Sequence, residues 1–357
     1  MELNRRAGKI ASSFFEIALY HSGKTSSSQS IKYASILILL GGHPCLPILI
    51  GIIGNETSPS CEKRAGPNEN HTEPPRLKNR TNLNAFDLRG LNPQYPAPIM
   101  KQENATVIEH HNFQGDYRIL HFAAPTVGPL VQPGQFLELQ VPQLGDRILR
   151  RPFSIYKADA ESVSILYKPV GRGTESMRLL NVGDAVNIIG PLGNGYPELS
   201  EGKTPVLVAG GYGNAALYLK AKELPVQGVA FFGGRSALDI LCIDEFKALG
   251  WDVRVTTNDG SLGTEGLVTD AFDPWLTEQN TDVELFVCGP NPMLKAMGDR
   301  AIEHGFTAWL SLDENMACGV GACLTCVIKR KTADGWEWAR CCKDGPIFES
   351  REIIWED

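Results

Sequence analysis

The stretch Cys318-Gly-Val-Gly-Ala-Cys323-Leu-Thr-Cys326 organises the C-terminal part of the chain, and Cys341-Cys342 follows it. Its spacing, C-x4-C-x2-C, is typical of plant-type [2Fe–2S] sites. Four thiolates must converge on two irons, so a tight loop supplies three and a later segment supplies the fourth. Gly319 and Gly321 suit such a loop, because glycine accepts positive φ and lets backbone N–H groups approach the sulfurs.

Two other interpretations of these cysteines remain open. A four-cysteine zinc site is possible, although its ligands usually come as two C-x2-C-like pairs. The cysteines could also be unligated core residues, because Cys packs as a small hydrophobic side chain. The spacing favours the iron–sulfur cluster, with Cys318, Cys323 and Cys326 as three of its ligands.

Length, charge and cysteine usage limit the possible functions. A chain of 357 residues can form two or three domains. A net charge of −7 gives no reason to expect a nucleic-acid partner. Of the nine cysteines, five lie between Cys318 and Cys342. This uneven, odd set favours metal ligation in a reducing compartment over a disulfide framework, so we expect a cytoplasmic protein.

Residues 1–99 differ from the rest of the chain. They contain 11 Lys/Arg and 7 Asp/Glu, and polar stretches at 25–30 and 55–80 indicate disorder. The apolar run Ser35–Ile53 is long enough to span a bilayer, but Gly41-Gly42-His43-Pro44 and Pro47 interrupt it, so we expect no membrane span. We expect residues 1–99 to be a largely disordered, dispensable leader, and a new globular segment to begin at Met100.

Residues 100–200 read as an antiparallel β-barrel, because short strands follow one another without helices between them. The expected strands are 105–109, 117–122, 135–141, 163–168 and 185–189. Within this barrel stands Arg151-Pro152-Phe153-Ser154. The glycines of Gly171-Arg-Gly173-Thr174 allow backbone N–H groups to face a phosphate, and a short helix over 175–181 would add a favourable dipole.

Residues 201–306 read as an α/β nucleotide-binding domain with a parallel sheet. We expect strands at 205–209, 226–232, 252–256 and 283–287, and helices from about 213 to 224, at 237–249 and at 292–304. Gly211-x-Gly213-x-x-Ala216 lies in the strand-to-helix setting that a dinucleotide site requires. Gly233-Gly234-Arg235 replaces the acidic residue of a standard NAD site.

The barrel and the α/β domain together resemble the ferredoxin–NADP reductase superfamily, whose R-x-x-S motif binds flavin. The resemblance implies that Arg151 pairs with the FAD pyrophosphate, that Phe153 and Ser154 line the flavin near its reactive N5 edge, and that Pro152 also belongs to the cofactor site. It places Leu166-Tyr167-Lys168 beside the adenosine portion and Gly173-Thr174 at a phosphate. Cys288-Gly289-Pro290-x-Pro-Met293 resembles the C-G-P-x-x-M element of that superfamily, with Cys288 close to the nicotinamide. Arg150, next to Arg151, leaves open which arginine reaches the cofactor.

Residues 100–357 resemble the electron-transfer subunits of dihydroorotate dehydrogenase B, the PyrK family. The most specific residues are Met316-Ala-Cys-Gly-Val-Gly-Ala-Cys-Leu-Thr-Cys326 and Cys342-Lys-Asp-Gly-Pro346. Gly190-Pro-Leu-Gly-Asn-Gly195 and Thr257-Asn-Asp-Gly-Ser261 add to the resemblance. It implies an α+β multidomain protein, with the barrel at 100–200, the NAD-binding domain at 201–306 and a [2Fe–2S] domain at 307–357.

The family places its fourth cluster ligand directly before Lys-Asp-Gly-Pro, which implies Cys342. Residues 327–331 and 336–340 read as a hairpin that returns Cys341 and Cys342 toward the cysteine loop. Adjacent strand residues face opposite ways, so only one of the two can ligate. The expected metal ligands are therefore Cys318, Cys323, Cys326 and Cys342.

Electron counting explains the cofactor set of FAD, a [2Fe–2S] cluster and NAD as acceptor. A nicotinamide exchanges a hydride, a cluster exchanges single electrons, and a flavin can do both. We therefore expect an electron relay without a catalytic acid–base pair. The family implies that a partner subunit with FMN oxidises dihydroorotate, that electrons pass through cluster and FAD to NAD+ in pyrimidine biosynthesis, and that two subunits of each kind form a heterotetramer.

Two alternative functions stay open on the sequence alone. The same architecture would serve an electron-transfer subunit of a hydrogenase or a sulfide dehydrogenase. A non-catalytic interaction module stabilised by zinc belongs to a different class of protein, and it would be colourless.

Overall fold

The computed structural model describes residues 18–19, 36–37, 100–141, 149–278 and 282–356. The expectations for residues 1–99 lie outside the described residues, apart from two-residue strands β1 (Ala18–Leu19) and β2 (Ile36–Leu37), which pair antiparallel. Everything below concerns the unit formed by residues 83–357. None of the helices in the described part of the chain is long and apolar enough to cross a membrane.

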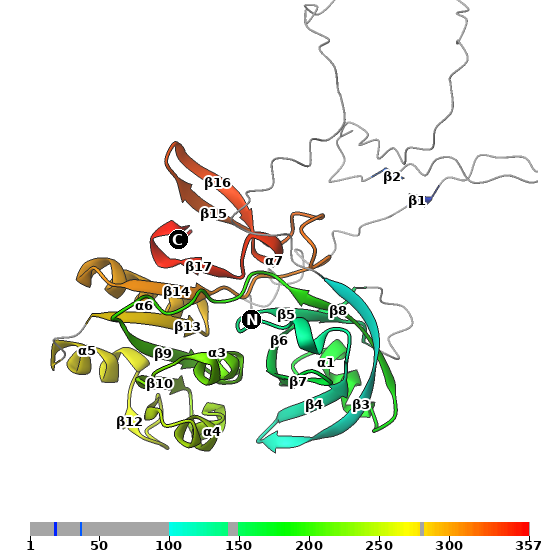
Figure 1. Cartoon of the computed structure of the whole chain (residues 1–357), viewed down its shortest axis with the longest axis horizontal. Helices are drawn as coiled ribbons and strands as arrows, with labels where there is room; N and C mark the ends of the chain where they lie inside the picture. Colours follow the sequence, from blue (N-terminus) through cyan, green and yellow to red (C-terminus); the bar gives the residue numbers. More distant parts are fainter. Residues whose placement is uncertain (1–17, 20–35, 38–99, 142–148, 279–281, 357) are drawn as a thin grey trace, which may run out of the picture. The chain divides into compact units, whose positions relative to one another are not determined.

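Six antiparallel strands close into a barrel in the order β3-β4-β7-β6-β5-β8, as predicted (Figure 1). Their bounds are β3 (Lys101–Gln114), β4 (Tyr117–Ala123), β5 (Phe136–Leu139), β6 (Arg151–Ala158), β7 (Ser162–Tyr167) and β8 (Ala185–Leu192). Alternate residues such as Leu120 and Phe122 are fully buried in the barrel core. Strand β6 was not among the expected strands, and the Arg151–Ser154 motif forms its first half.

The helix expected at 175–181 begins earlier than predicted. Helix α1 spans Arg172–Ser176, and a 3-10 turn, Met177–Leu179, follows it. The start is set by Gly171, which is extended, and by Thr174. The Thr174 hydroxyl oxygen accepts the backbone N–H groups of Val170 at 2.9 Å and Gly171 at 3.2 Å. Gly173 and Thr174 therefore lie within the helix, not in a loop before it.

The second half of the chain forms a seven-stranded sheet in the order β12-β11-β10-β9-β13-β14-β17, parallel except for β17 (Figure 1). The strands are β9 (Thr204–Gly210), β10 (Val229–Gly234), β11 (Asp252–Thr257), β12 (Thr264–Glu265), β13 (Val283–Cys288), β14 (Thr307–Ser311) and β17 (Ile347–Glu349). The helices are α2 (Gly213–Ala216), α3 (Tyr218–Glu223), α4 (Ile243–Ala248), α5 (Val268–Glu278) and α6 (Asn291–His304).

Both faces of this sheet are buried, because successive residues of each strand point to opposite sides. Val206 and Val208 of β9 belong to one core with α5 and α6, whereas Leu207 and Ala209 belong to the other core with α2, α3 and α4. This two-sided cover holds the carboxyl ends of β9, β10 and β13 at one edge, where ligands bind in such folds.

The helix expected at 237–249 is interrupted. A 3-10 turn, Ala237–Asp239, precedes α4, and Cys242 between them has a left-handed φ of 61°. Two strands of the segment expected as a cluster domain, β14 and β17, complete the large sheet. The cysteine loop therefore lies between two strands of that sheet along the chain.

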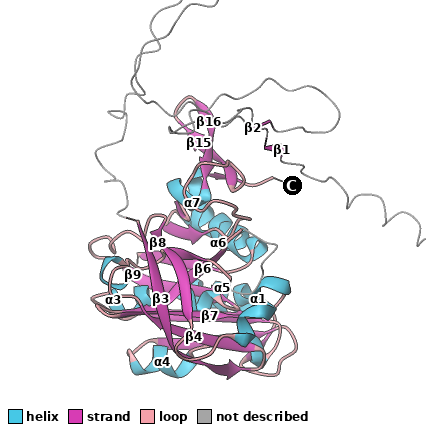
Figure 2. Cartoon of the chain, turned by 90° about the vertical axis from the view of Figure 1, so that its right-hand side faces the viewer, coloured by secondary structure: helices cyan, strands magenta, loops and turns pink. Residues whose placement is uncertain are grey.

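The remaining elements are the hairpin of β15 (Val327–Thr332) and β16 (Gly335–Arg340), strand β18 (Ile353–Ile354) beside β15, and helix α7 (Cys341–Asp344). Figure 2 shows the hairpin and α7 beyond the barrel strand β8. The hairpin was predicted, and its second strand, β16, ends at Arg340. Cys341 and Cys342 begin α7 instead of continuing the strand, so their different environments do not come from strand alternation.

Candidate functional site

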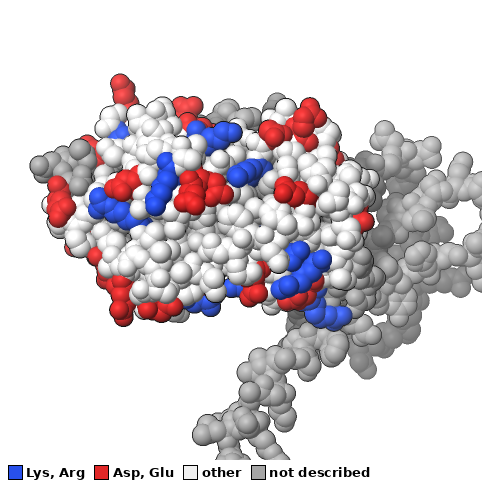
Figure 3. All heavy atoms as spheres, turned by 90° about the horizontal axis from the view of Figure 1, so that it is seen from below, with Lys and Arg blue, Asp and Glu red and all other residues white. Residues whose placement is uncertain are grey.

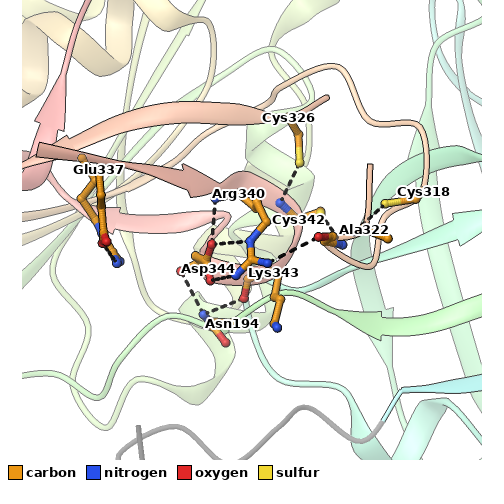
Figure 4. Close-up of polar contacts among 11 residues, drawn as sticks. Asn194, Cys318, Ala322, Cys326, Glu337, Arg340, Cys342, Lys343 and Asp344 are labelled. Carbon is orange, nitrogen blue, oxygen red and sulfur yellow. Dashed lines mark hydrogen bonds and ion pairs between the residues drawn. The ribbon is translucent and has the colours of Figure 1, made fainter. Parts of the chain in front are cut away.

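The cysteine loop is held in a conformation that turns its backbone donors toward sulfur. Gly319 and Gly321 have φ values of 66° and 79°, a region that favours glycine. The N–H of Gly321 donates to Cys342 Sγ at 3.1 Å, and the N–H of Ala322 donates to Cys318 Sγ at 3.2 Å (Figure 4). Such N–H donors stabilise thiolates and tune a bound cluster.

The four predicted ligands lie as two pairs. Cys318 contributes to lowering the pKa of Cys323, which puts these two thiols close together, and Cys326 Sγ accepts the Cys342 N–H at 3.4 Å. In the part of the chain that the structure describes, no three His, Cys, Asp or Glu side chains form a group that could hold a single metal ion. Two adjoining thiol pairs fit a two-iron cluster, in which each iron takes two cysteines.

The environments of the thiols differ. Burial would raise the pKa of the Cys323 thiol, yet hydrogen bonds from Thr325 and Cys318 lower it to about 7. Burial and then Cys326 raise the pKa of Cys342 to about 12, so this thiol must lose its proton when it binds iron. Cys341 is fully buried, and its Sγ donates to the carbonyl of Leu312 at 3.3 Å. Burial raises the pKa of Cys341 well above its usual value.

Helix α7 is fastened to the barrel by a side chain from another motif. Asn194, in the Gly-rich turn after β8, donates from Nδ2 to the Asp344 carbonyl at 3.0 Å (Figure 4). Its backbone N–H donates to the Gly345 carbonyl at 2.7 Å. Arg340 precedes the first residue of α7, and its Nε donates to Asp344 Oδ2, at the end of the helix, at 2.9 Å. The Gly190–Gly195 and Cys342–Pro346 motifs therefore form one contact between the cluster segment and the barrel.

A pocket of about 410 Å³ brings the predicted flavin residues together. Its lining includes Pro152, Phe153, Ser154, Leu166, Tyr167, Lys168, Thr174 and Cys288. Arg151 and Gly173 are not in the lining, but they lie against each other, because a Cβ on Gly173 would be 3.0 Å from Arg151 Nε. Arg150 is directed to β8, where Nη1 and Nη2 donate to the Asn187 carbonyl and Oδ1 at 2.9 and 2.5 Å.

The residues that line the pocket fit an FAD molecule. The volume lies within the range of ligand sites, and apolar side chains dominate with a few polar groups among them. Met316 and Pro346, on either side of the cysteine ligands in sequence, also line this pocket. A flavin bound there would therefore contact the segments that carry the cysteines.

A second pocket, of about 660 Å³, lies at the carboxyl edge of the sheet and shares Tyr117, Tyr212 and Arg235 with the first. Of the two glycines predicted to bind a nucleotide, Gly211 lines this pocket and Gly213 does not. A Cβ on Gly213 would come within 2.1 Å of the Cys288 carbonyl, so Gly213 lets α2 pack against β13. Cys288 lines the first pocket, and burial raises its pKa to about 12, which keeps the thiol neutral.

Sequence reasoning missed Tyr117 and Asp239 at the boundary between the two pockets. The Tyr117 hydroxyl donates to Asp239 Oδ1 at 3.0 Å, and Lys168 Nζ lies 3.6 Å from the same oxygen. Tyr117 and Lys168 come from the barrel, whereas Asp239 comes from the α/β domain. Nothing local distinguishes Tyr117 from an ordinary strand aromatic, so only the fold reveals the contact.

Glu138 is a second residue that the sequence did not single out. It lies in β5, is 1% exposed, and neither carboxylate oxygen has a hydrogen-bond partner among the described residues. A Cβ on Gly319 would approach its Cγ to 2.5 Å, so it lies directly beneath the cysteine loop. Burial raises the pKa of Glu138 to about 7, against the attraction of Arg150 and Arg151.

The raised pKa of Glu138 should make the free energy of unfolding depend on pH. Between its unfolded pKa near 4.5 and its folded pKa near 7, the folded protein holds a proton that the unfolded chain has lost. Stability therefore falls as pH rises through this window, by about 3 kcal/mol in total. We expect Glu138→Gln to match the parent in thermal midpoint at pH 5 and to exceed it at pH 8. Glu161→Gln, at an exposed carboxylate, is the control; parallel pH profiles for Glu138→Gln and the parent would contradict the prediction.

A barrel that carries the predicted flavin residues, a parallel sheet with a pocket at its carboxyl edge and an adjoining cysteine loop are features of a ferredoxin reductase-like flavoprotein with an iron–sulfur segment. Solved structures agree with this class. The structure of an NADH-dependent reduced ferredoxin–NADP oxidoreductase matches with a TM-score of 0.63 and 27% identity over 71% of this chain and 90% of that one. The ferredoxin reductase in carbazole 1,9a-dioxygenase matches in fold, with a TM-score of 0.51 and 20% identity over 59% of this chain and 68% of that one.

The chain belongs to the family of electron-transfer subunits of dihydroorotate dehydrogenase B. Residues 313–354 match the family model of the iron–sulfur cluster binding domain of dihydroorotate dehydrogenase B. The subunit of Shouchella clausii is 37% identical over 262 residues, which cover 71% of this chain and 98% of the relative. The subunit of Fusobacterium nucleatum is also 37% identical, covering 71% of this chain and 99% of the relative. The predicted family and fold class are thereby confirmed.

Proposed function

We propose that the chain carries electrons from an FMN-containing dihydroorotate dehydrogenase catalytic subunit to NAD+, in the synthesis of UMP. It is an oxidoreductase subunit that uses a [2Fe–2S] cluster and FAD. The oxidation of dihydroorotate belongs to the catalytic subunit. The observation that carries this proposal is the contiguity of the three sites. Met316 and Pro346 join the cysteine loop to the first pocket, and Tyr117, Tyr212 and Arg235 are common to both pockets.

We assign the metal ligands as Cys318, Cys323, Cys326 and Cys342. Arg151 is assigned to the FAD pyrophosphate and Thr174, beside Gly173, to a phosphate, because the guanidinium rests against Gly173 at the edge of the first pocket. When bound, FAD supplies the conversion between a hydride and single electrons. Phe153 and Ser154 shape the pocket around it, and the buried, neutral Cys288 faces the same space from the end of β13.

The exposed face of the β15–β16 hairpin suits the partner subunit. Trp336 and Trp338 are 52% and 54% exposed, and their ring centroids lie 5.3 Å apart. Lys329 Nζ lies 5.2 and 5.6 Å from the two rings. Leu324 is 60% exposed beside Cys323. Exposed tryptophans rimmed by polar groups are typical of protein interfaces, and the hairpin that carries them begins at Val327, directly after Cys326.

We further propose a cytoplasmic heterotetramer of two catalytic and two electron-transfer subunits. Clustered cysteines suit a reducing compartment. On the face seen in Figure 3 acidic and basic side chains lie side by side, which supports a protein partner over nucleic acid there.

The test is co-expression with the FMN-containing subunit of the same organism, followed by an assay of dihydroorotate oxidation with NAD+. We expect co-purification and NAD+-dependent activity. The double variant Trp336→Ser/Trp338→Ser should lose both while it still reduces an artificial dye with NADH. Val182→Ser, which changes an exposed side chain elsewhere, is the control. A parent complex without NAD+-linked activity would refute the function, and a double variant that assembles normally would refute the docking face.

A further inference from the structure

The second pocket contains two arginines, and each is already bound to a carboxylate. In the described part of the chain, the charged side chains that line this pocket are Arg235, Asp239 and Arg300. Arg235 follows β10, the position where a standard NAD site carries an acidic residue. Its Nε donates to Asp239 Oδ2 at 2.8 Å and its Nη2 to Asp239 Oδ1 at 3.3 Å. Both oxygens of Asp239 are thus occupied by one guanidinium.

Arg300, in α6, is held in the same way by α5. Its Nε donates to Asp273 Oδ1 at 2.5 Å and its Nη2 to Asp273 Oδ2 at 2.6 Å. Its Nη1 donates to the Ala296 carbonyl at 3.1 Å, and the charges of Glu303 and Asp270 act on it as well. This fork-to-fork geometry is the strongest form of Arg–carboxylate pairing.

Asp239 is also fixed by two side chains of the barrel. It is 5% exposed, it accepts the Tyr117 hydroxyl from the barrel, and Lys168 Nζ lies 3.6 Å away. Lys168 faces the flavin pocket and does not line the second one. Arg235 is 76% exposed, but Tyr117 and Lys168 also hold Asp239, so the carboxylate stays at the pocket whichever way Arg235 turns.

These pairs matter for the phosphate that distinguishes NADP from NAD. A phosphate monoester carries a charge of about −1.5 to −2 at neutral pH and binds best to unpaired guanidinium groups. Here Nε and Nη2 of each arginine are already bound to a carboxylate, so a phosphate would have only the remaining N–H groups and would lie beside that carboxylate's negative charge. The 2′-hydroxyl of NAD has no such conflict, because a hydroxyl can donate to a carboxylate.

We infer that Asp239 and Asp273 bias the second pocket toward NAD(H), because they occupy Nε and Nη2 of Arg235 and Arg300 and place a negative charge beside any 2′-phosphate. This inference rests on the proposed function, which places the nicotinamide nucleotide in this pocket. Asp239 and Asp273 act on the phosphate through the arginines, so they are positioning residues that set specificity.

The test compares the dissociation constants of NADH and NADPH for the FAD-loaded, cluster-containing protein, measured anaerobically by titration calorimetry at fixed ionic strength. The parent should prefer NADH. Asp239→Asn should shift the NADH-to-NADPH preference toward NADPH by about tenfold, the effect of roughly one charge-assisted hydrogen bond. Asp273→Asn should shift it in the same direction and provides a second variant if the first loosens the contact with Tyr117.

Asp252→Asn is the matched control. It removes the same charge from an exposed carboxylate that pairs with Arg254 at the opposite end of the strands. In the reduction of an artificial dye by NADPH, Asp239→Asn and Asp273→Asn should lower the KM for NADPH. A general loss of structure would not lower it. A parent that binds both nucleotides equally, or an unchanged preference in both variants, would overturn the inference alone. If neither nucleotide bound the loaded protein, the proposed function would fail with it.

Discussion

Replacing Cys342 by serine should remove the iron–sulfur cluster, whereas replacing Cys341 should leave it in place. Cys342 Sγ accepts the Gly321 N–H, and the Cys342 N–H donates to Cys326 Sγ, so Cys342 faces the cysteine loop. Cys341 Sγ faces the opposite way, toward the Leu312 carbonyl in a core that excludes solvent. Serine at 342 offers a harder, less acidic donor where iron–sulfur clusters are held by thiolates.

The measurement is iron and acid-labile sulfide content, together with the electron paramagnetic resonance signal of the reduced protein. These separate the cluster from FAD, which also absorbs visible light. Cys342→Ser should lose all three signals, and Cys341→Ser should keep them. Because serine at 341 places a hydroxyl in an apolar site, we also expect it to lower the thermal midpoint. Retention of the cluster in Cys342→Ser with loss in Cys341→Ser would reverse the assignment.

The sequence predicted those parts of the site whose residues lie close together along the chain. C-x4-C-x2-C brings three thiols together within nine residues, and the positive φ values of Gly319 and Gly321 accompany a tight loop whose Gly321 and Ala322 N–H groups donate to sulfur. Likewise Pro152, Phe153 and Ser154 are adjacent in sequence and line one pocket. In such cases residues that are close in sequence are also close in the structure, so the pattern is enough to predict the contact.

The parts that the sequence did not predict depend on distant partners. Tyr117 and Asp239 are 122 residues apart, and their contact exists only because β4 of the barrel meets the turn after β10. Asn194 reaches Asp344 across 150 residues. Strand β14 was missed because its burial alternates over only five residues, and α7 because four residues give too short a pattern to distinguish a helix from the end of a strand.

The second large effect concerns FAD affinity and depends on which of Arg150 and Arg151 binds the pyrophosphate. Arg151→Ala should weaken FAD binding by about ten- to a hundredfold, the effect of losing a charge-assisted contact to pyrophosphate. Arg151 lies against Gly173 beside the first pocket, whereas Arg150 donates twice to Asn187 in β8. Arg150→Ala should therefore retain FAD and lower only the stability of the barrel. Arg151→Lys should fall between, because an ammonium keeps the charge but loses the planar fork.

Flavin content after purification and the dissociation constant of FAD, from recovery of flavin fluorescence on dilution, measure this effect. Circular dichroism of each variant shows whether the barrel is intact. The distinction is physical: a guanidinium that binds a cofactor changes affinity, whereas one that ties two strands together changes unfolding. If Arg150→Ala lost the flavin while Arg151→Ala kept it, the pyrophosphate would have to lie on the Asn187 side of the barrel, and the first pocket would not be the flavin site.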